Sequence, residues 1–156
     1  MTVKEKILKM LQEADIKYRS IEHEPVYTSK EAAEIRDTRD DMGAKALICS
    51  ADKKPVLIVV PGNKKVDFKA FKHRFNVSDL YLLSPEKVTE LTGLEIGSIP
   101  PVGKAMDLPS YYDITFREVD DVAFNAGSHT FSIVMQAADL IKLEEPRFGK
   151  FACSKS

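Results

Sequence analysis

The sequence predicts a single mixed α/β domain, and three observations lead to this fold class. The chain has 156 residues, of which 44% are hydrophobic and 30% charged, a composition that suits one globular core. Its most apolar stretch, residues 56–60, is hydrophobic on both faces, as a central strand should be. Segments with helical periodicity alternate with short segments of strand type. We expect residues 1–145 to form the domain and residues 146–156, which lack any period, to be a flexible C-terminal tail.

Five helices are expected. A Ser or Thr followed three residues later by Glu forms a capping box, which satisfies free N–H groups where a helix begins. Thr2 with Glu5 and Thr28 with Glu31 have this spacing, and apolar positions with helical spacing follow each pair. Asp67 is the expected cap of a third helix. We place the helices at residues 2–14, 28–35, 66–75, 84–92 and 137–143.

Seven strands are expected, at residues 16–21, 45–51, 56–61, 80–83, 113–119, 122–126 and 130–135. Residues 52–55 form the turn between the second and third strands. Strand alternation puts Lys45 on the same face as Leu47 and Cys49, so its ammonium group lies at the end of an apolar row. Two interpretations remain open: Lys45 serves a functional site, or its side chain extends into solvent where the strand begins.

Residues 97–103, Gly-Ser-Ile-Pro-Pro-Val-Gly, are the segment that least resembles packing material. Glycine allows a close backbone approach to a ligand, while two adjacent prolines fix their φ angles and carry no N–H. The segment therefore cannot be a helix or a central strand, and we expect a rigid loop. Its accessible amides suit a ligand, and a tight connection between two strands is the alternative.

Composition and motifs exclude several classes of protein. The formal net charge is −1, so a nucleic-acid partner must be held by a local patch, and we expect no DNA partner. Cys49 and Cys153 lie far apart, with no Cys-x-x-Cys pair and no suitably spaced His, so we expect reduced thiols and no metal site. The sequence contains no Walker A loop, no Rossmann glycine pattern, no Gly-x-Ser-x-Gly and no His-Glu-x-x-His motif. Among the His residues, His129 beside a Gly-Ser turn is the candidate site member.

The sequence favours a cytoplasmic protein without a membrane partner. No segment approaches the roughly 20 apolar residues of a membrane-spanning helix, and the N-terminus lacks the apolar run of a signal peptide. One segment is strongly basic and consists of Lys64, Lys65, Lys69, Lys72, His73 and Arg74. Such a segment can contact phosphates, and a solvated helix face is the alternative.

The order of these pieces resembles the YbaK/prolyl-tRNA synthetase editing-domain family over residues 18–143. The matching features, in chain order, are Pro-Val-Tyr-Thr at residues 25–28 before an Ala-rich helix, Gly-Ala-Lys-Ala-Leu at 43–47, residues 64–71 after the Val-rich strand, Thr-Gly at 92–93, the loop 97–103, Asp113, and Ala-Gly-Ser at 126–128. The most specific features are the Thr-Gly followed by Gly-x-x-x-Pro-x-Gly and the lysine that opens the strand.

This resemblance implies a twisted, barrel-like mixed sheet flanked by helices. It also implies an enzyme that hydrolyses mischarged aminoacyl-tRNA in trans, with water as the nucleophile and without a metal or cofactor. Free-standing members include Cys-tRNA(Pro) and Ala-tRNA(Pro) deacylases, so the expected partners are mischarged tRNA and prolyl-tRNA synthetase or another synthetase. The implied catalytic residues are Lys45, Gly97, Ser98, Ile99 and Gly103. The implied substrate-binding residues are Tyr27, Ala46, Pro100, Pro101, Asp113, Gly127, Ser128 and His129. The implied tRNA-binding residues are Lys64, Lys65, Lys69, Lys72 and Arg74.

The resemblance does not fix the amino acid, because Ala46 follows Lys45 where Ala-specific members resemble Lys-Asn and Cys-specific members resemble Lys-Thr. Two other classes of function remain: a non-catalytic module that binds tRNA or a synthetase, and a small-molecule hydrolase outside translation. Lys45 and both loop glycines favour the enzyme over the first class. The basic helix around Lys69 and Lys72 favours an RNA substrate, and so argues against a small-molecule hydrolase.

Overall fold

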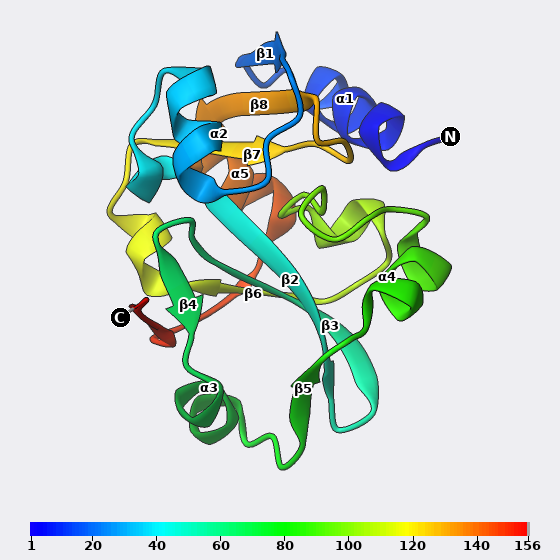
Figure 1. Ribbon diagram of the computed structural model, residues 1–156, viewed down its shortest axis with the longest axis vertical. Helices are drawn as coiled ribbons and strands as arrows, with labels where there is room; N and C mark the ends of the chain where they lie inside the picture. Colours follow the sequence, from blue (N-terminus) through cyan, green and yellow to red (C-terminus); the bar gives the residue numbers. More distant parts are fainter. Residues whose placement is uncertain (156) are drawn as a thin grey trace.

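The computed structural model describes residues 1–155 and confirms the mixed α/β class (Figure 1). Its helices are α1 (Val3–Glu13), α2 (Ser29–Arg36), α3 (Phe68–Phe75), α4 (Pro85–Thr92) and α5 (Ala137–Glu144), with short 3₁₀ turns η1 (Asp40–Met42), η2 (Gly103–Ala105) and η3 (Ile114–Arg117). Its strands are β1 (Tyr18–Glu22), β2 (Ala44–Ala51), β3 (Lys54–Pro61), β4 (Lys64–Val66), β5 (Leu80–Leu82), β6 (Ser110–Asp113), β7 (Asp121–Asn125), β8 (Phe131–Gln136), β9 (Arg147–Gly149) and β10 (Ala152–Ser154). Within residues 1–155, no helix is both long and apolar enough to cross a membrane.

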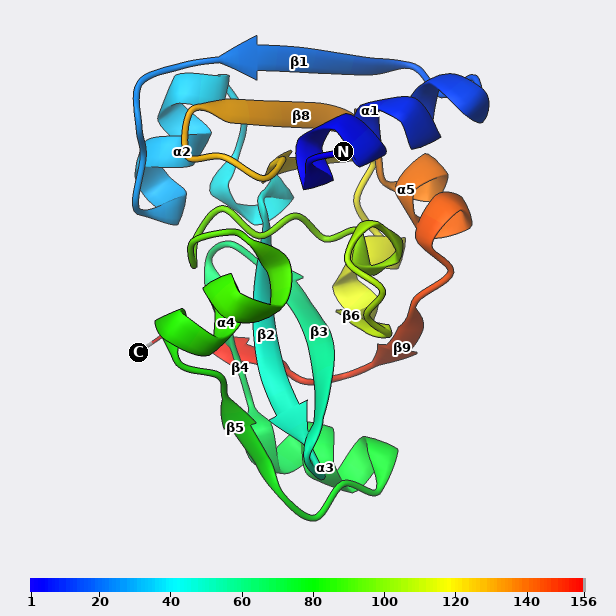
Figure 2. The same ribbon diagram turned by 90° about the vertical axis from the view of Figure 1, so that its right-hand side faces the viewer.

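The strands form three sheets. The five-stranded sheet has the order β5-β2-β3-β6-β9, with β3 antiparallel to β2 and parallel to β6. The second sheet has the order β1-β8-β7, and the third pairs β10 with β4. Figure 2 shows β1 and β8 at one end of the molecule, from which β2 and β3 extend toward α3 at the other end. In the described part of the chain the strands remain in these separate sheets and do not close into a barrel.

Strand β3 is the centre of the five-stranded sheet, as its two apolar faces predicted. Leu57 and Val59 belong to one core, which lies between this sheet, the β1-β8-β7 sheet and helices α1 and α5. Val56, Ile58 and Val60 belong to a second core under α3. Because successive side chains of a strand point to opposite faces, one strand supplies both cores.

The predicted capping boxes form at α1 and α2. The Thr2 and Thr28 hydroxyls accept hydrogen bonds from the N–H groups of Glu5 and Glu31, and each glutamate carboxylate accepts the N–H of its capping threonine. Asp67 caps α3 as predicted, accepting the Ala70 N–H at 3.0 Å. The segment 64–66 before it pairs as strand β4.

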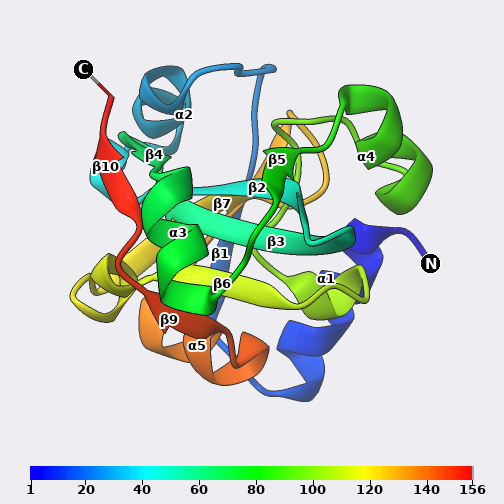
Figure 3. The same ribbon diagram turned by 90° about the horizontal axis from the view of Figure 1, so that it is seen from below.

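The C-terminal segment corrects the prediction of a flexible tail. Residues 147–149 pair with β6, and residues 152–154 pair with β4. Phe151 between them is fully buried against Phe71, at 5.2 Å between ring centroids. Figure 3 shows β9 and β10 running past α3. Strands of three residues are too short to show a period in the sequence, and burial of one aromatic ring holds this segment.

Residues 113–119 also differ from the prediction of a strand. Strand β6 ends at Asp113, whose carboxylate accepts the Thr115 N–H at 3.1 Å and caps the η3 turn. A side chain that accepts a hydrogen bond from a nearby amide competes with strand pairing, so the chain turns here.

Candidate functional site

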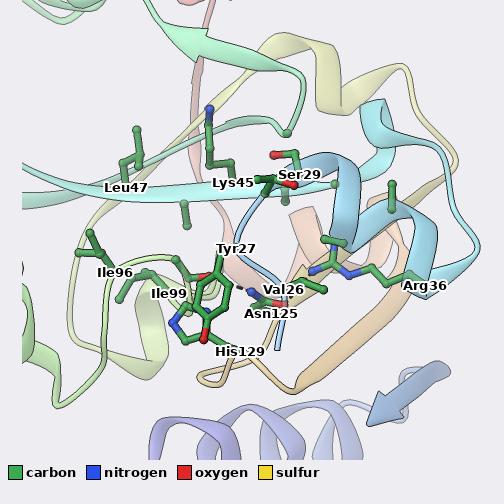
Figure 4. A pocket seen from close by; sticks show the side chains of 18 residues that line it. Val26, Tyr27, Ser29, Arg36, Lys45, Leu47, Ile96, Ile99, Asn125 and His129 are labelled. Atoms are coloured by element: carbon green, nitrogen blue, oxygen red, sulfur yellow. Dashed lines mark hydrogen bonds between the residues drawn. The ribbon is translucent and has the colours of Figure 1, made fainter. Parts of the chain in front are cut away.

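A cavity of about 370 Å³ lies between α2, the start of β2, the loop around Gly97 and the turn after β7. Its wall combines aliphatic side chains with three basic residues, Arg36, Lys45 and His129 (Figure 4). None of the lining residues in the described chain is Asp or Glu. The cavity is therefore suited to a ligand that carries negative charge or electron-rich oxygen.

Two glycines hold the elements of this cavity together. The Gly62 N–H donates to the Gly43 carbonyl at 2.7 Å, and Gly43 forms an isolated bridge with Ala123 of β7, so the start of β2 is fixed between two sheets. A Cβ at Gly62 would lie 3.0 Å from the Ser29 hydroxyl oxygen. A glycine at this position therefore lets α2 lie close to the end of β3 without crowding.

Lys45 is a cavity residue, and its side chain does not extend freely into solvent. Its Nζ donates to the Lys64 carbonyl at 2.6 Å. Burial, and then the nearby charge of Lys155, lower the pKa of the Lys45 amine to about 8. Figure 4 shows Lys45 and Leu47 pointing to the same side of β2, as predicted, and away from Tyr27 and His129. The ammonium form still predominates at pH 7, with a neutral fraction far above that of an exposed lysine.

Arg36 is a second cation in the cavity and was missed by the sequence analysis. Its side chain is only 5% exposed, and burial lowers the pKa of its guanidinium to about 10. Its Nε donates to the Ser132 hydroxyl at 2.9 Å, and one terminal nitrogen donates to the Asn125 Oδ1 at 2.9 Å. Both acceptors are neutral.

Asn125 links this arginine to the loop around Gly97. Its Oδ1 accepts from Arg36, and its Nδ2 donates to the Gly97 carbonyl at 2.8 Å. The two bonds fix which way the amide faces, because the oxygen must accept and the nitrogen must donate. Arg36, Asn125 and Gly97 thus form one connected chain along the cavity.

The loop around Gly97 presents only part of its backbone. Gly97 has φ of +85°, and a Cβ there would lie 3.0 Å from the His129 Cε1, so a side chain would strike the imidazole. The Ser98 N–H and hydroxyl both donate to the Glu95 carbonyl, at 3.2 and 2.7 Å. Within residues 1–155, the N–H groups of Gly97 and Ile99 have no protein acceptor. Both residues line the cavity, so these two amides are candidates for contact with a ligand.

His129 and Tyr27 stand together at the cavity. Their ring centroids are 5.1 Å apart with an interplanar angle of 41°. The His129 Nε2 lies 3.4 Å from the exposed Glu95 carboxylate, and its buried Nδ1 has no hydrogen-bond partner in the described residues. Tyr27 is 75% exposed. The pair is therefore open to a planar group that stacks at the mouth.

The structure brings six of the predicted catalytic and substrate-binding residues together around this cavity. They are Tyr27, Lys45, Ala46, Gly97, Ile99 and His129. The remaining predicted residues lie outside it, in the described structure, for reasons that are visible in their contacts.

Gly103, Pro100 and Pro101 serve the core. The Gly103 N–H donates to the Glu144 carboxylate at 2.7 Å, so this amide is not available to a substrate. A Cβ at Gly103 would lie 2.3 Å from the Leu108 carbonyl oxygen, which explains the glycine. Both prolines are buried, and the Pro101 carbonyl accepts a hydrogen bond from the Tyr112 hydroxyl. The predicted use of the Gly103 amide therefore does not fit this structure, and these contacts lend no support to the predicted roles of the two prolines.

Asp113 is likewise a structural residue rather than a pocket residue. It is 2% exposed, and its Oδ1 accepts the N–H groups of Phe151 and Ala152, each at 2.8 Å. The carboxylate anchors the C-terminal segment.

Ser98, Gly127 and Ser128 surround the cavity without lining it. The Gly127 N–H donates to the Ser98 carbonyl at 3.0 Å, and Gly127 has φ of +86°. The Ser128 hydroxyl bonds the Thr130 hydroxyl at 2.9 Å. These contacts shape the turn that carries His129 to the loop around Gly97.

The predicted tRNA-binding residues lie on β4 and α3. Lys65 and Lys69 are exposed, while Lys64 and Lys72 are half-buried. The Arg74 guanidinium donates to the Phe148 carbonyl at 3.2 Å and lies 4.9 Å from the Phe75 ring centroid. The Lys64 carbonyl that holds Lys45 belongs to this same basic strand, so the surface and the cavity adjoin.

A signal for Arg36 was present in the sequence. Arg36 follows Ala32 by four residues and Ala33 by three, so it lies on the buried face of α2. The predicted helix ended at residue 35, so Arg36 was placed in the polar segment that follows it. The Asn125 side chain has no comparable signal, because its partners Gly97 and Arg36 lie 28 and 89 residues away.

Within residues 1–155, no three His, Cys, Asp or Glu side chains gather as they would around a metal ion. The thiol of Cys49 is fully buried, and burial raises its pKa to about 12. A thiolate nucleophile is not available from this residue near neutral pH.

Comparison with known proteins gives consistent matches. A family described as aminoacyl-tRNA editing domain matches residues 23–143. The chain is 29% identical over 152 residues to the multifunctional Ser/Thr-tRNA deacylase ProXp-y of Escherichia coli (strain K12), covering 94% of this chain and 91% of that protein. It is 25% identical over 157 residues to the prolyl-tRNA editing protein ProX of Acetoanaerobium sticklandii, covering 97% and 96%. A crystal structure described as a candidate trans-editing enzyme for prolyl tRNA synthetase shares the fold, with a TM-score of 0.84 at 23% identity over 99% of both chains.

Proposed function

Since this chain belongs to the family of aminoacyl-tRNA editing domains, we propose that it is a trans-acting deacylase that hydrolyses the ester of mischarged tRNA. The observation that carries the proposal is a cavity lined by Lys45, Gly97 and Ile99 and by no acidic side chain, in which the N–H groups of Gly97 and Ile99 have no acceptor within the described residues. Such donors are what a developing oxyanion requires.

The proposed reaction needs no covalent intermediate on the protein. Water adds to the ester carbonyl, and the carbonyl oxygen becomes an oxyanion that the amides of Gly97 and Ile99 bind. The C–O bond to the ribose then breaks, the ribose oxygen takes one proton of the attacking water, the other proton goes to solvent, and the amino acid leaves as a carboxylate. The ribose hydroxyl next to the ester orients the water, so the protein supplies positioning and electrostatics rather than a general base. Lys45, which lines the cavity and is mostly protonated at pH 7, adds positive charge to the site.

The proposed substrates are tRNAs that carry small amino acids. Cys-tRNA(Pro) and Ala-tRNA(Pro) follow from the family, and the Ser/Thr-tRNA deacylase named above adds Ser and Thr. A synthetase cannot reject a smaller or isosteric side chain strongly by binding alone, which is why such an activity is needed. Lys65 and Lys69 on the adjoining surface would contact the phosphates of the acceptor stem. Prolyl-tRNA synthetase, or another synthetase, is the proposed protein partner.

A panel of charged tRNAs tests this function. Incubation with Ala-, Cys-, Ser- and Thr-charged tRNA(Pro), with correctly charged Pro-tRNA(Pro) as the control, should release at least one small amino acid well above the rate without protein. Binding of these tRNAs without any release would instead indicate a non-catalytic tRNA-binding module.

A further inference from the structure

Arg36 carries a buried charge that no carboxylate neutralises in the described chain. Its side chain is 5% exposed, and no ion pair within residues 1–155 includes it. A guanidinium has five N–H donors, of which Ser132 and Asn125 accept one each. Buried charges in proteins are normally paired, because removal of an unpaired charge from water is costly. An unpaired guanidinium in a cavity wall therefore indicates an anionic ligand.

The remaining donors have open space beside them. Arg36 lines the cavity, and Figure 4 shows its side chain reaching from α2 toward Asn125 beside Val26. A Cβ at Gly43 would lie 3.7 Å from the Arg36 Nη1, so a larger residue there would place its side chain next to the guanidinium. Gly43 thus leaves the free end of the guanidinium accessible from the cavity.

A purely structural role does not require the charge. Ser132 and Asn125 are neutral acceptors, and a neutral amide could donate to either of them. Lys45, the other long cation of the cavity, points to the far side of β2 and has Nζ bonded to the Lys64 carbonyl (Figure 4). The space near Asn125 therefore contains one strong, unneutralised donor group.

We propose that Arg36 binds an oxyanion of the ligand in this cavity through its free N–H groups, in the bidentate manner that a guanidinium offers to carboxylate and phosphate. The assignment of that ligand rests on the proposed deacylase function. Aminoacyl-tRNA has two sources of such an oxyanion, the phosphodiester of the terminal nucleotide and the carboxylate that hydrolysis releases. The site would hold the tRNA end in the first case and retain the product amino acid in the second.

Matched pairs of small probes test the proposal without any turnover. Calorimetry would compare AMP with adenosine, and N-acetyl-L-serine with N-acetyl-L-serinamide, on the wild-type protein. At least one anionic member should bind tenfold or more tighter than its neutral twin, as expected for a hydrogen-bonded charge pair. A preference for AMP over adenosine identifies the phosphate as the group that Arg36 binds. A preference for N-acetyl-L-serine over N-acetyl-L-serinamide identifies the carboxylate. Equal affinity within both pairs, or no binding by any of the four at millimolar concentration, would overturn the proposal.

Variants then test whether Arg36 is the residue that causes the preference for the anionic probe. Arg36→Gln should abolish the preference for the anion, whereas Lys30→Gln, with the same charge change on the exposed side of α2, should retain it. Loss of the preference in Lys45→Gln but not in a folded Arg36→Gln would contradict the assignment to Arg36.

Two further readouts keep the test decisive. If Arg36→Gln does not fold, the ¹⁵N resonance of the Arg36 Nε in the wild type should shift with the anionic probe and not with its neutral twin; an unmoved resonance overturns the proposal.

Since binding is measured at equilibrium, a protein that binds anions but releases no amino acid from tRNA refutes the deacylase function and leaves the Arg36 site standing. A protein that hydrolyses mischarged tRNA but shows no preference for either anion refutes the Arg36 site and leaves the deacylase function standing.

Discussion

The Lys45 Nζ donates a hydrogen bond to the backbone carbonyl of Lys64 at 2.6 Å, and this contact joins the cavity to the C-terminal segment. Lys64 pairs with Ser154 in the β4–β10 sheet, and Lys155 follows directly. The charge of Lys155 is one cause of the lowered pKa of Lys45. The end of the chain therefore tunes the ionisation of the lysine that we place at the reacting ester.

The first prediction concerns pH. Burial and Lys155 disfavour the charged form, so the pKa of Lys45 is lowered to about 8 and the amine loses its proton as pH rises through that value. If the ammonium is the active form, deacylation corrected for spontaneous hydrolysis should fall above about pH 8. Lys155→Gln should move the midpoint to higher pH, because one of the causes of the lowered pKa is removed. Single-turnover rates between pH 6 and 10 measure this.

The matched control is Lys150→Gln, another exposed lysine of the C-terminal segment, which should leave the midpoint unchanged. A corrected rate that rises through pH 8 would show instead that the neutral amine is the active form.

The second prediction concerns Cys49. A Ser hydroxyl would be buried without a partner in the core under α3, so Cys49→Ser should lower the free energy of unfolding by about 1–3 kcal/mol in urea titrations. Deacylation per folded molecule should remain within a few-fold of wild type, since the thiol is buried and has a pKa of about 12. The half-buried Cys153, replaced by Ser, is the control for a general effect of losing a thiol. Loss of turnover with the fold retained would overturn the water mechanism.

The third prediction concerns the basic surface. Reversal of three lysines should raise the KM for tRNA and reduce the dependence of log K on log salt, because phosphate contacts release counterions. The three are Lys65, Lys69 and Lys72.

A control with the same charge change uses three exposed lysines around α1, at the opposite end of the molecule in Figure 1: Lys6, Lys9 and Lys17. If both triple variants change the KM equally, only net charge matters, and α3 is a solvated face.

The fourth prediction tests the structural role of Asp113. Its carboxylate accepts four hydrogen bonds, from the Thr115 N–H and hydroxyl and from the N–H groups of Phe151 and Ala152. Asp113→Ala should lower the free energy of unfolding by at least about 2 kcal/mol and speed hydrogen exchange at Phe151. Asp120→Ala, at an exposed position, should change stability by less than about 0.5 kcal/mol. Equal stability of the two variants would show that this anchor contributes little.

Local signals in the sequence predicted those parts of the fold that depend on neighbouring residues. The capping boxes of Thr2 and Thr28 and the two-faced strand β3 act within a few residues, so their patterns are legible in one chain. The position of Phe151 depends on the rings of Phe71 and Phe75, 80 and 76 residues away, which no local period encodes.

The candidate site also has a part that local sequence signals predicted and a part that depends on distant residues. Lys45, Gly97 and His129 were identified by residue type and order, and they do line one cavity. Gly103 was misassigned, because a glycine that permits close packing and one that presents an amide look alike in sequence. Pairing of the Asn125 amide with Arg36 and Gly97 depends on three distant segments, so only the folded arrangement reveals it.

The most direct test of the account is single-turnover deacylation of Ala-, Cys-, Ser- and Thr-charged tRNA by the wild type and by Lys45→Ala, with circular dichroism to confirm folding. The wild type should cleave at least one of these esters, and Lys45→Ala should be slower by at least about a hundredfold, the scale of losing one preorganised electrostatic contact. Lys45→Arg should not fully restore the rate, since a planar guanidinium cannot occupy the position of a compact ammonium bonded to the Lys64 carbonyl. A well-folded Lys45→Ala protein with wild-type activity would show that the proposed site is wrong.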